Sequence, residues 1–200
     1  EIAQCLVGSE MCIRDRDRAL GYDFESGNCC GFRRSRRIRG ECDECGIRYK
    51  VLVMRFIDLI VIHCSATCED RPFTGQALEA AHRKRGFDGT GYHFYVRRDG
   101  RILTTRAVER VGAHARGYNA HSIGICYEGG LDHYGLPKDT RTEWQRHSLR
   151  VLVRTLLKDY PDARVVGHRD LSPDLNGDGE VEPMEWTKEC PCFEVKRERW

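Results

Sequence analysis

An almost unbroken apolar run at residues 56–62 constrains the fold of this chain more than any other segment. Its residues are hydrophobic and largely β-branched, and only Asp58 interrupts them. A strand with one wet face alternates apolar and polar residues, whereas a continuous run is typical of a strand buried on both faces. We therefore expect this strand to lie inside a sheet that other elements cover on both sides.

The segments that follow alternate between strand and helix patterns. A helix is predicted at 74–85, ending at Gly86, and a longer one extends from a capping box of Thr142 and Gln145 to Pro161. Short strands are predicted at 92–96, at 102–103 after a turn, at 122–127 and at 163–167. This mixed order indicates an α/β fold, with helices packed on a sheet.

Composition narrows the functional classes. The 33 basic and 31 acidic residues give a net charge of +2, which disfavours a dedicated nucleic-acid binder. No apolar run approaches the roughly 18 residues of a membrane span. The chain has eleven cysteines, an odd number, and no recognisable signal peptide. A complete disulfide framework therefore does not account for the cysteines. We expect no nucleic-acid partner and no membrane span, and metal ligation becomes a hypothesis to test.

Residues 1–50 differ from the rest of the chain because they lack sustained apolar periodicity. An arginine-rich stretch at 33–39 is typical of a solvated tail. A small zinc ribbon is the alternative, with Cys29, Cys30, Cys42 and Cys45 as its ligands. Residues 9–16 resemble a translated sequencing adapter, and Met54 resembles a natural start. We expect 1–50 to be a non-native or disordered extension, and 54–200 to be the functional domain.

Two histidines follow predicted strands, where α/β sheets place their ligand crevices. His63 ends the first strand, His168 follows the strand at 163–167, and Cys190 lies farther along. Two imidazoles and a thiolate leave one position of a tetrahedral zinc site for water, as in catalytic centres. Taken singly, each residue is also compatible with a structural histidine or an inert buried thiol.

Five motifs carry a family resemblance, namely VIHCSAT (61–67), GYHF (91–94), VGAHARGYN (111–119), SIGIC (122–126) and KECP (188–191). In this order they resemble the zinc-dependent N-acetylmuramoyl-L-alanine amidases of the type-2 class. That class includes phage lysozyme-type endolysins and the peptidoglycan recognition proteins of animals. The resemblance extends from about Met54 to Val195 and implies one domain, with a central mixed β-sheet flanked by helices.

The resemblance also implies a role for individual residues. His63, His168 and Cys190 match the zinc ligands of the family. Tyr92 and Lys188 match its catalytic tyrosine and lysine, and His114 lies where relatives line the substrate groove. The implied reaction is hydrolysis of the amide between the lactyl group of N-acetylmuramic acid and L-alanine in peptidoglycan.

The same resemblance implies a monomer that is made in the cytoplasm and acts on the cell wall after release. A non-catalytic peptidoglycan-binding module is the alternative, but members of that subclass usually lack the cysteine ligand, which is present here as Cys190. The sequence leaves open the stem-peptide preference, export, and the choice between phage or prophage lysis and recycling of the host wall.

An acidic segment, DLNGDGEVEPME (174–185), separates His168 from Cys190, and compact phage relatives have a much shorter loop there. It fits the calcium-loop template D-x-[DN]-x-[DN]-G-x5-E. The expected ligands are Asp174, Asn176, Asp178, the carbonyl of Glu180, Glu182 and Glu185. Pro173 and Pro183 disfavour the flanking helices of an EF-hand, so an ordinary acidic turn is the alternative.

Overall fold

The computed structural model describes residues 38–41, 48–51 and 55–200. The chain divides into two units, Glu1–Val53 and Met54–Trp200. In the first unit, β1 (Ile38–Glu41) and β2 (Arg48–Val51) pair antiparallel. The cysteines considered for a zinc ribbon lie outside the described residues, and the expectation for 1–50 stays a prediction.

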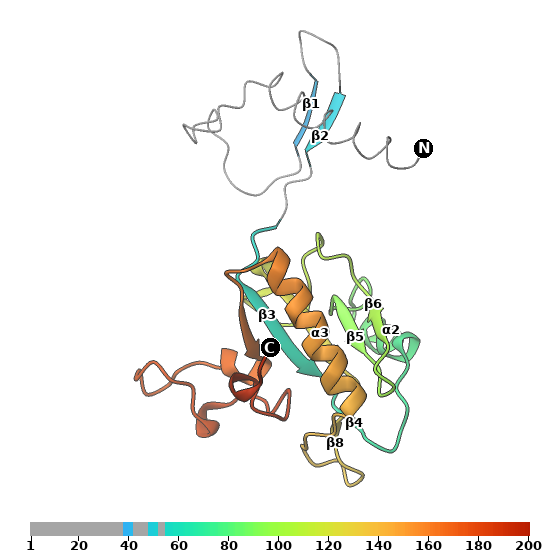
Figure 1. Ribbon diagram of the computed structural model, residues 1–200, viewed down its shortest axis with the longest axis vertical. Helices are drawn as coiled ribbons and strands as arrows, with labels where there is room; N and C mark the ends of the chain where they lie inside the picture. The colour runs from blue at the N-terminus through green and yellow to red at the C-terminus, as the bar shows by residue number, and fades with distance from the viewer. Residues whose placement is uncertain (1–37, 42–47, 52–54) are drawn as a thin grey trace. The chain divides into compact units, whose positions relative to one another are not determined.

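The second unit is built on a five-stranded sheet with the order β6-β5-β7-β3-β9 (Figure 1). Four strands pair parallel and β6 is an antiparallel edge, so the sheet is mixed, as expected. The strands are β3 (Leu59–Cys64), β5 (Phe94–Val96), β6 (Ile102–Thr104), β7 (Ser122–Tyr127) and β9 (Arg164–Gly167). A separate parallel pair joins β4 (Thr67–Cys68) to β8 (Gly130–Leu131).

Strand β3 lies between β7 and β9, and every residue in it is buried. The predicted burial of both faces is therefore confirmed, but the predicted start at Phe56 is wrong. Pairing with β7 and β9 begins only at Leu59, and the side chain of Phe56 is 67% exposed. The apolar run thus extends beyond the hydrogen-bonded ladder at its beginning.

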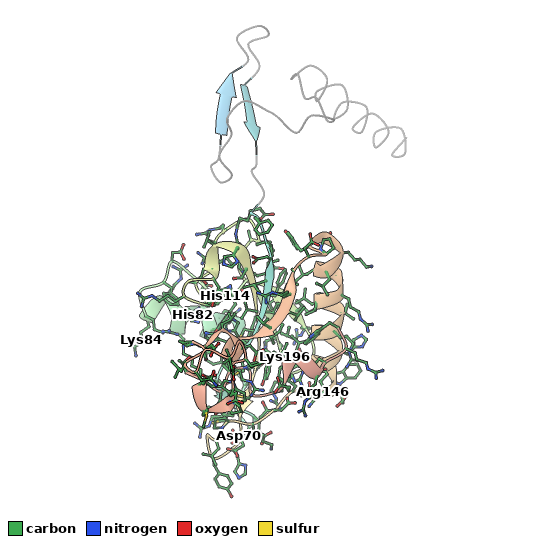
Figure 2. The ribbon with its side chains drawn as sticks, turned by 90° about the vertical axis from the view of Figure 1, so that its left-hand side faces the viewer. Asp70, His82, Lys84, His114, Arg146 and Lys196 are labelled. Carbon is green, nitrogen blue, oxygen red and sulfur yellow. The ribbon has the colours of Figure 1, made fainter. Side chains whose placement is uncertain are left out.

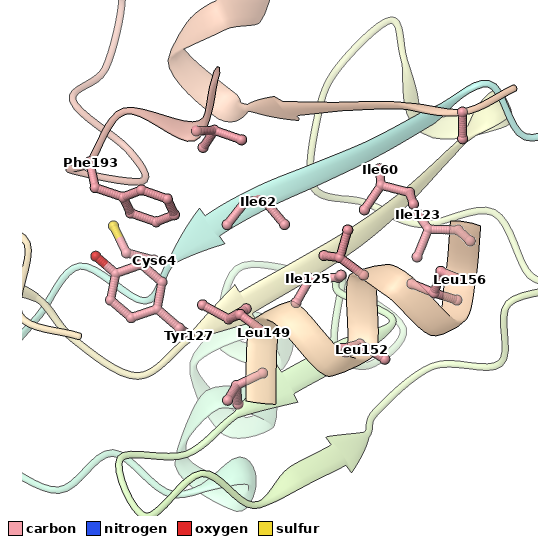
Figure 3. Close-up of a cluster of buried hydrophobic side chains, with 14 of the residues drawn as sticks. Ile60, Ile62, Cys64, Ile123, Ile125, Tyr127, Leu149, Leu152, Leu156 and Phe193 are labelled. Carbon is pink, nitrogen blue, oxygen red and sulfur yellow. The ribbon is translucent and has the colours of Figure 1, made fainter. Parts of the chain in front are cut away.

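Two α-helices cover the two faces of the sheet. Helix α3 (Glu143–Asp159) begins at Thr142, whose predicted capping box with Gln145 is confirmed. Its apolar stripe packs on one face, with Leu149, Leu152, Val153 and Leu156 against Ile60, Ile62, Ile123 and Ile125 (Figure 3). Helix α2 (Gly75–Lys84) contributes Leu78 to a second cluster, with Tyr95 and Cys126.

Alternation along the strands decides which residues share a face. Because Ile60 and Ile62 face α3, His63 points to the opposite side of β3. On β7, Cys126 lies beside His63 in the parallel register and belongs to the cluster of α2. The sheet therefore presents His63 on the α2 side.

Within residues 55–200, four short 3₁₀ segments lie outside the sheet and the α-helices: η1 (Asn119–His121), η2 (His168–Leu171), η3 (Pro183–Glu185) and η4 (Val195–Arg197). The second of these begins with His168, directly after β9. Among the helices in the described part of the chain, none has the length and apolar character needed to cross a bilayer.

Candidate metal centre

Three predicted metal ligands meet at the carboxyl ends of neighbouring parallel strands. His63 comes from β3, His168 from the start of η2, and Cys190 from the segment that follows η3. One donor atom from each lies within 4.8 Å of the other two. The Nδ1 atom of His63 is 3.9 Å from the Sγ atom of Cys190, and the rings of His63 and His168 are 4.5 Å apart at their centroids.

The protonation states of this cluster suit metal binding. Burial lowers the pKa of His63 well below its ordinary value, with His114 and His168 adding to the effect. Burial and then the charge of Lys188 lower the pKa of His168 to about 4. Both imidazoles are therefore neutral at pH 7, the form that ligates metals.

The thiol of Cys190 also has a suitable environment. The backbone N–H of Cys64 donates a hydrogen bond of 3.3 Å to its Sγ atom, which holds the sulfur beside the end of β3. Two imidazole nitrogens and one thiolate are a donor set that zinc accepts, with a fourth position left open. Ligands on a tetrahedral zinc lie roughly 3.3–3.6 Å apart, so small side-chain rotations would close this cluster on an ion. The residues fit the metal that the family implies.

Tyr92 lies beside the cluster, just before β5. Its ring centroid is 5.0 Å from that of His63 and 5.3 Å from that of His82 of α2. Burial raises the pKa of Tyr92 well above its ordinary value, so its hydroxyl is protonated at neutral pH. The structure thus brings Tyr92 together with the predicted metal ligands.

Lys188 is an exposed residue, two positions before Cys190. Its ammonium group is close enough to contribute to the lowered pKa values of His63 and His168. An exposed cation therefore acts electrostatically on the two histidines of the cluster.

The position of His114 differs from that expected of a residue lining a groove. The side chain is buried, and its Nδ1 atom lies 3.0 Å from Nε2 of His63. Its ring lies 6.4 Å from that of Tyr92, on the same side of the domain as His82 (Figure 2). Its contact with substrate stays a prediction, whereas its contact with His63 is a feature of the structure.

Sequence reasoning missed the proximity of two further thiols, those of Cys64 and Cys192. The Sγ atoms of Cys64 and Cys192 lie 3.8 Å apart, although the two residues are far apart in the chain. The sequence signal that could have indicated this contact is that each thiol lies close in the chain to a predicted metal ligand. Cys64 follows His63, and Cys192 lies two residues after Cys190. Neither belongs to the group of three converging donors.

The acidic loop holds its carboxylates by backbone hydrogen bonds. Asp174 accepts from the N–H groups of Gly177 and Gly179, at 2.6 and 2.8 Å. Glu185 is buried and accepts from Leu175 and Glu182, at 2.7 and 2.9 Å. Within the described ranges, the loop contributes no group of converging His, Cys, Asp or Glu donors, and no α-helix flanks it.

Stability of the metal-free protein should fall in mild acid. Burial lowers the pKa of His93 to about 4 and that of His114 to about 3. In the unfolded chain both titrate near 6.5, so the unfolded state binds more protons as pH decreases from there toward 4. The free energy of unfolding should decrease over this range, by about 3 kcal/mol from the fully buried His93 alone.

Urea titrations of chelator-treated protein between about pH 7.5 and about pH 4.5 measure this dependence. His93→Gln should flatten the pH profile, whereas His147→Gln, at an exposed position of α3, should keep the wild-type slope. Identical slopes in His93→Gln and the wild type would contradict the assignment.

Comparison with known proteins adds independent information. Residues 53–192 match the family described as N-acetylmuramoyl-L-alanine amidase (Amidase_2). The endolysin of Escherichia phage T7 is 36% identical over 140 residues, which cover 70% of this chain and 83% of the endolysin. The solved N-acetylmuramoyl-L-alanine amidase LysC from Clostridium intestinale URNW superimposes with a TM-score of 0.55 at 32% identity, over 70% of this chain and 80% of that chain.

A more distant solved structure, Drosophila PGRP-LB, shares the fold with a TM-score of 0.52 at 24% identity, over 69% of this chain and 76% of that chain. The expected α/β fold and the expected family are both confirmed. The matched range includes the sheet, His63, His168 and Cys190. The chain belongs to the N-acetylmuramoyl-L-alanine amidase family.

Proposed function

We propose that this protein is a zinc-dependent amidase that cuts the bond between N-acetylmuramic acid and L-alanine in peptidoglycan. The observation that carries the proposal is the convergence of His63, His168 and Cys190 within 4.8 Å. The alternative of a binding module without activity is disfavoured because the cysteine donor is present beside Tyr92 and Lys188. A lytic role after release to the wall fits the similarity to the phage T7 endolysin.

His63, His168 and Cys190 would hold the zinc. When bound, zinc lowers the pKa of a coordinated water and polarises a carbonyl group. Tyr92 retains its proton at neutral pH, so its hydroxyl can orient the attacking water and pass a proton toward the departing amine. The ammonium of Lys188 would stabilise negative charge that develops on the carbonyl oxygen of the scissile amide.

The acidic loop at 174–185 has a separate proposed role as a calcium site. The sequence template and the five carboxylates within the loop support it, since a cation would relieve their repulsion. Calcium would stiffen the connector that carries Lys188 and Cys190. Its role would be structural and independent of the zinc.

Removing the metal should abolish activity. We expect purified protein to release peptides that begin with L-alanine from peptidoglycan, chelation to stop the release, and added zinc to restore it. Cys190→Ser and His63→Ala should lower activity by more than about 100-fold together with the bound zinc. Cys68→Ser, at a half-buried thiol outside the cluster, is the matched control and should behave as wild type. Unimpaired activity in either ligand variant would exclude this zinc assignment.

Substitution of the two proposed catalytic side chains should lower the rate of hydrolysis without changing zinc binding. Tyr92→Phe should lower kcat by about 10²–10⁴-fold, and Lys188→Met by about 10²–10³-fold, with the zinc content unchanged. Tyr134→Phe and Lys158→Met change the same groups at exposed positions away from the cluster, and should keep wild-type kcat. Wild-type kcat in Tyr92→Phe or Lys188→Met would remove that residue from the mechanism.

Calcium should raise the melting temperature of the protein by about 2–8 °C at millimolar concentration. The calcium-induced increase should vanish in Asp178→Ala and Glu185→Ala but persist in Asp162→Ala, an exposed acid outside the loop. Because Glu185 also accepts backbone hydrogen bonds, each variant is compared with itself, with and without calcium. No increase in the wild type, together with full activity of both loop variants, would identify an ordinary acidic turn.

A further inference from the structure

The two ring nitrogens of His63 face different partners. Its Nδ1 atom faces Sγ of Cys190 at 3.9 Å, within the metal cluster. Its Nε2 atom lies 3.0 Å from Nδ1 of His114, and the two rings meet edge to face at 83°. Both side chains are buried, so this second contact is shielded from water.

The chemistry of a metal-bound imidazole assigns the direction of that hydrogen bond. A histidine that gives its Nδ1 lone pair to a metal carries its proton on Nε2. The Nε2–H group of His63 therefore donates to Nδ1 of His114. The proton of His114 then lies on its own Nε2 atom, which is 3.4 Å from the hydroxyl of Ser122, a fully buried residue of β7.

The ring of His114 occupies space that two glycines leave free. Gly124 lies in β7, on the same face as Ser122, and a Cβ atom at this position would come within 2.5 Å of the His114 ring. A Cβ atom at Gly112 would come within 2.6 Å of it. Glycine inside a strand commonly marks such a close approach.

The backbone of His114 is fixed as well as its ring. The side-chain oxygen of Asn119 accepts the N–H groups of both His114 and Ala115, at 2.8 and 2.9 Å. These bonds close the short loop that carries the histidine. With the ring held against Gly124, the acceptor atom of His114 is placed before any metal arrives.

We propose that His114 is a positioning residue for the metal centre. It accepts the Nε2–H of His63, fixes the tautomer and orientation of that ring, and so prepares Nδ1 for zinc. The proposal rests on the proposed role of His63 as a zinc ligand. This positioning role replaces direct substrate contact as the proposed function of His114. The hydroxyl of Ser122 completes the chain of hydrogen bonds.

The test measures the zinc dissociation constant of the full chain by competition with a chromophoric chelator. The protein carries Cys42→Ser and Cys45→Ser in every sample, because those thiols could bind zinc by themselves. His114→Leu removes the acceptor at similar size and should weaken zinc binding about 10–100-fold. His114→Asn places an amide oxygen near the position of Nδ1 and should stay within about threefold of the parent protein.

Gly124→Ala tests the same idea without changing the histidine. The added methyl group should displace the ring and weaken zinc binding in the same direction as His114→Leu. His147→Leu, at an exposed position, is the matched control and should bind zinc as the parent does. If His114→Leu does not fold, as judged by circular dichroism of the metal-free protein, His114→Asn and Gly124→Ala decide the outcome.

The possible outcomes separate this proposal from the zinc assignment itself. Parent-like zinc affinity in His114→Leu, with a raised KM, would overturn the positioning role and favour a groove residue. Parent-like affinity in Gly124→Ala, or weak binding in both His114→Leu and His114→Asn, would also overturn it. Parent-like affinity in His63→Ala would instead show that the zinc assignment had failed.

Discussion

The pairing of β3 between β7 and β9 is the constraint on which the rest of the domain depends. Both edges of this strand are hydrogen-bonded in parallel register, and both of its faces are covered. Moving the register by one residue would turn Ile60 and Ile62 away from α3 and move His63 into the apolar cluster on that side. Burial of the isoleucines therefore fixes the face on which His63 appears, and the candidate metal centre takes its geometry from the core.

Much of the fold could be predicted because its signals are local. The strand at 122–127 and the capping box at Thr142 depend on short segments, and both are found where the sequence placed them. The start of β3 could not be predicted, because it depends on partners far along the chain. The order of strands in the sheet and the β4–β8 pair depend on similar long-range pairings, which no sequence period encodes.

The candidate site divides in the same way between what sequence indicates and what packing decides. The ends of two predicted strands pointed to His63 and His168, and the family resemblance joined them with Cys190. The burial of His114 could not be read from its motif, because it depends on space left by a glycine in another strand. Gly124 within an otherwise apolar strand was the available signal, and it acquires meaning only when the ring beside it is known.

The thiol of Cys190 and the imidazole of His63 face each other in the candidate metal centre, although they are 127 residues apart in the chain. Phe193 and Val195, which follow the thiol, are themselves part of the core that contains Ile62 and Tyr127. During synthesis, the emerging chain therefore exposes His63 long before Cys190 and the core residues that follow it leave the ribosome. A polypeptide interrupted before Cys190 lacks the thiol of the candidate metal centre and the core residues Phe193 and Val195. The three candidate donors can therefore meet only after Cys190 has been synthesised, so translation delays the assembly of this site relative to the appearance of His63.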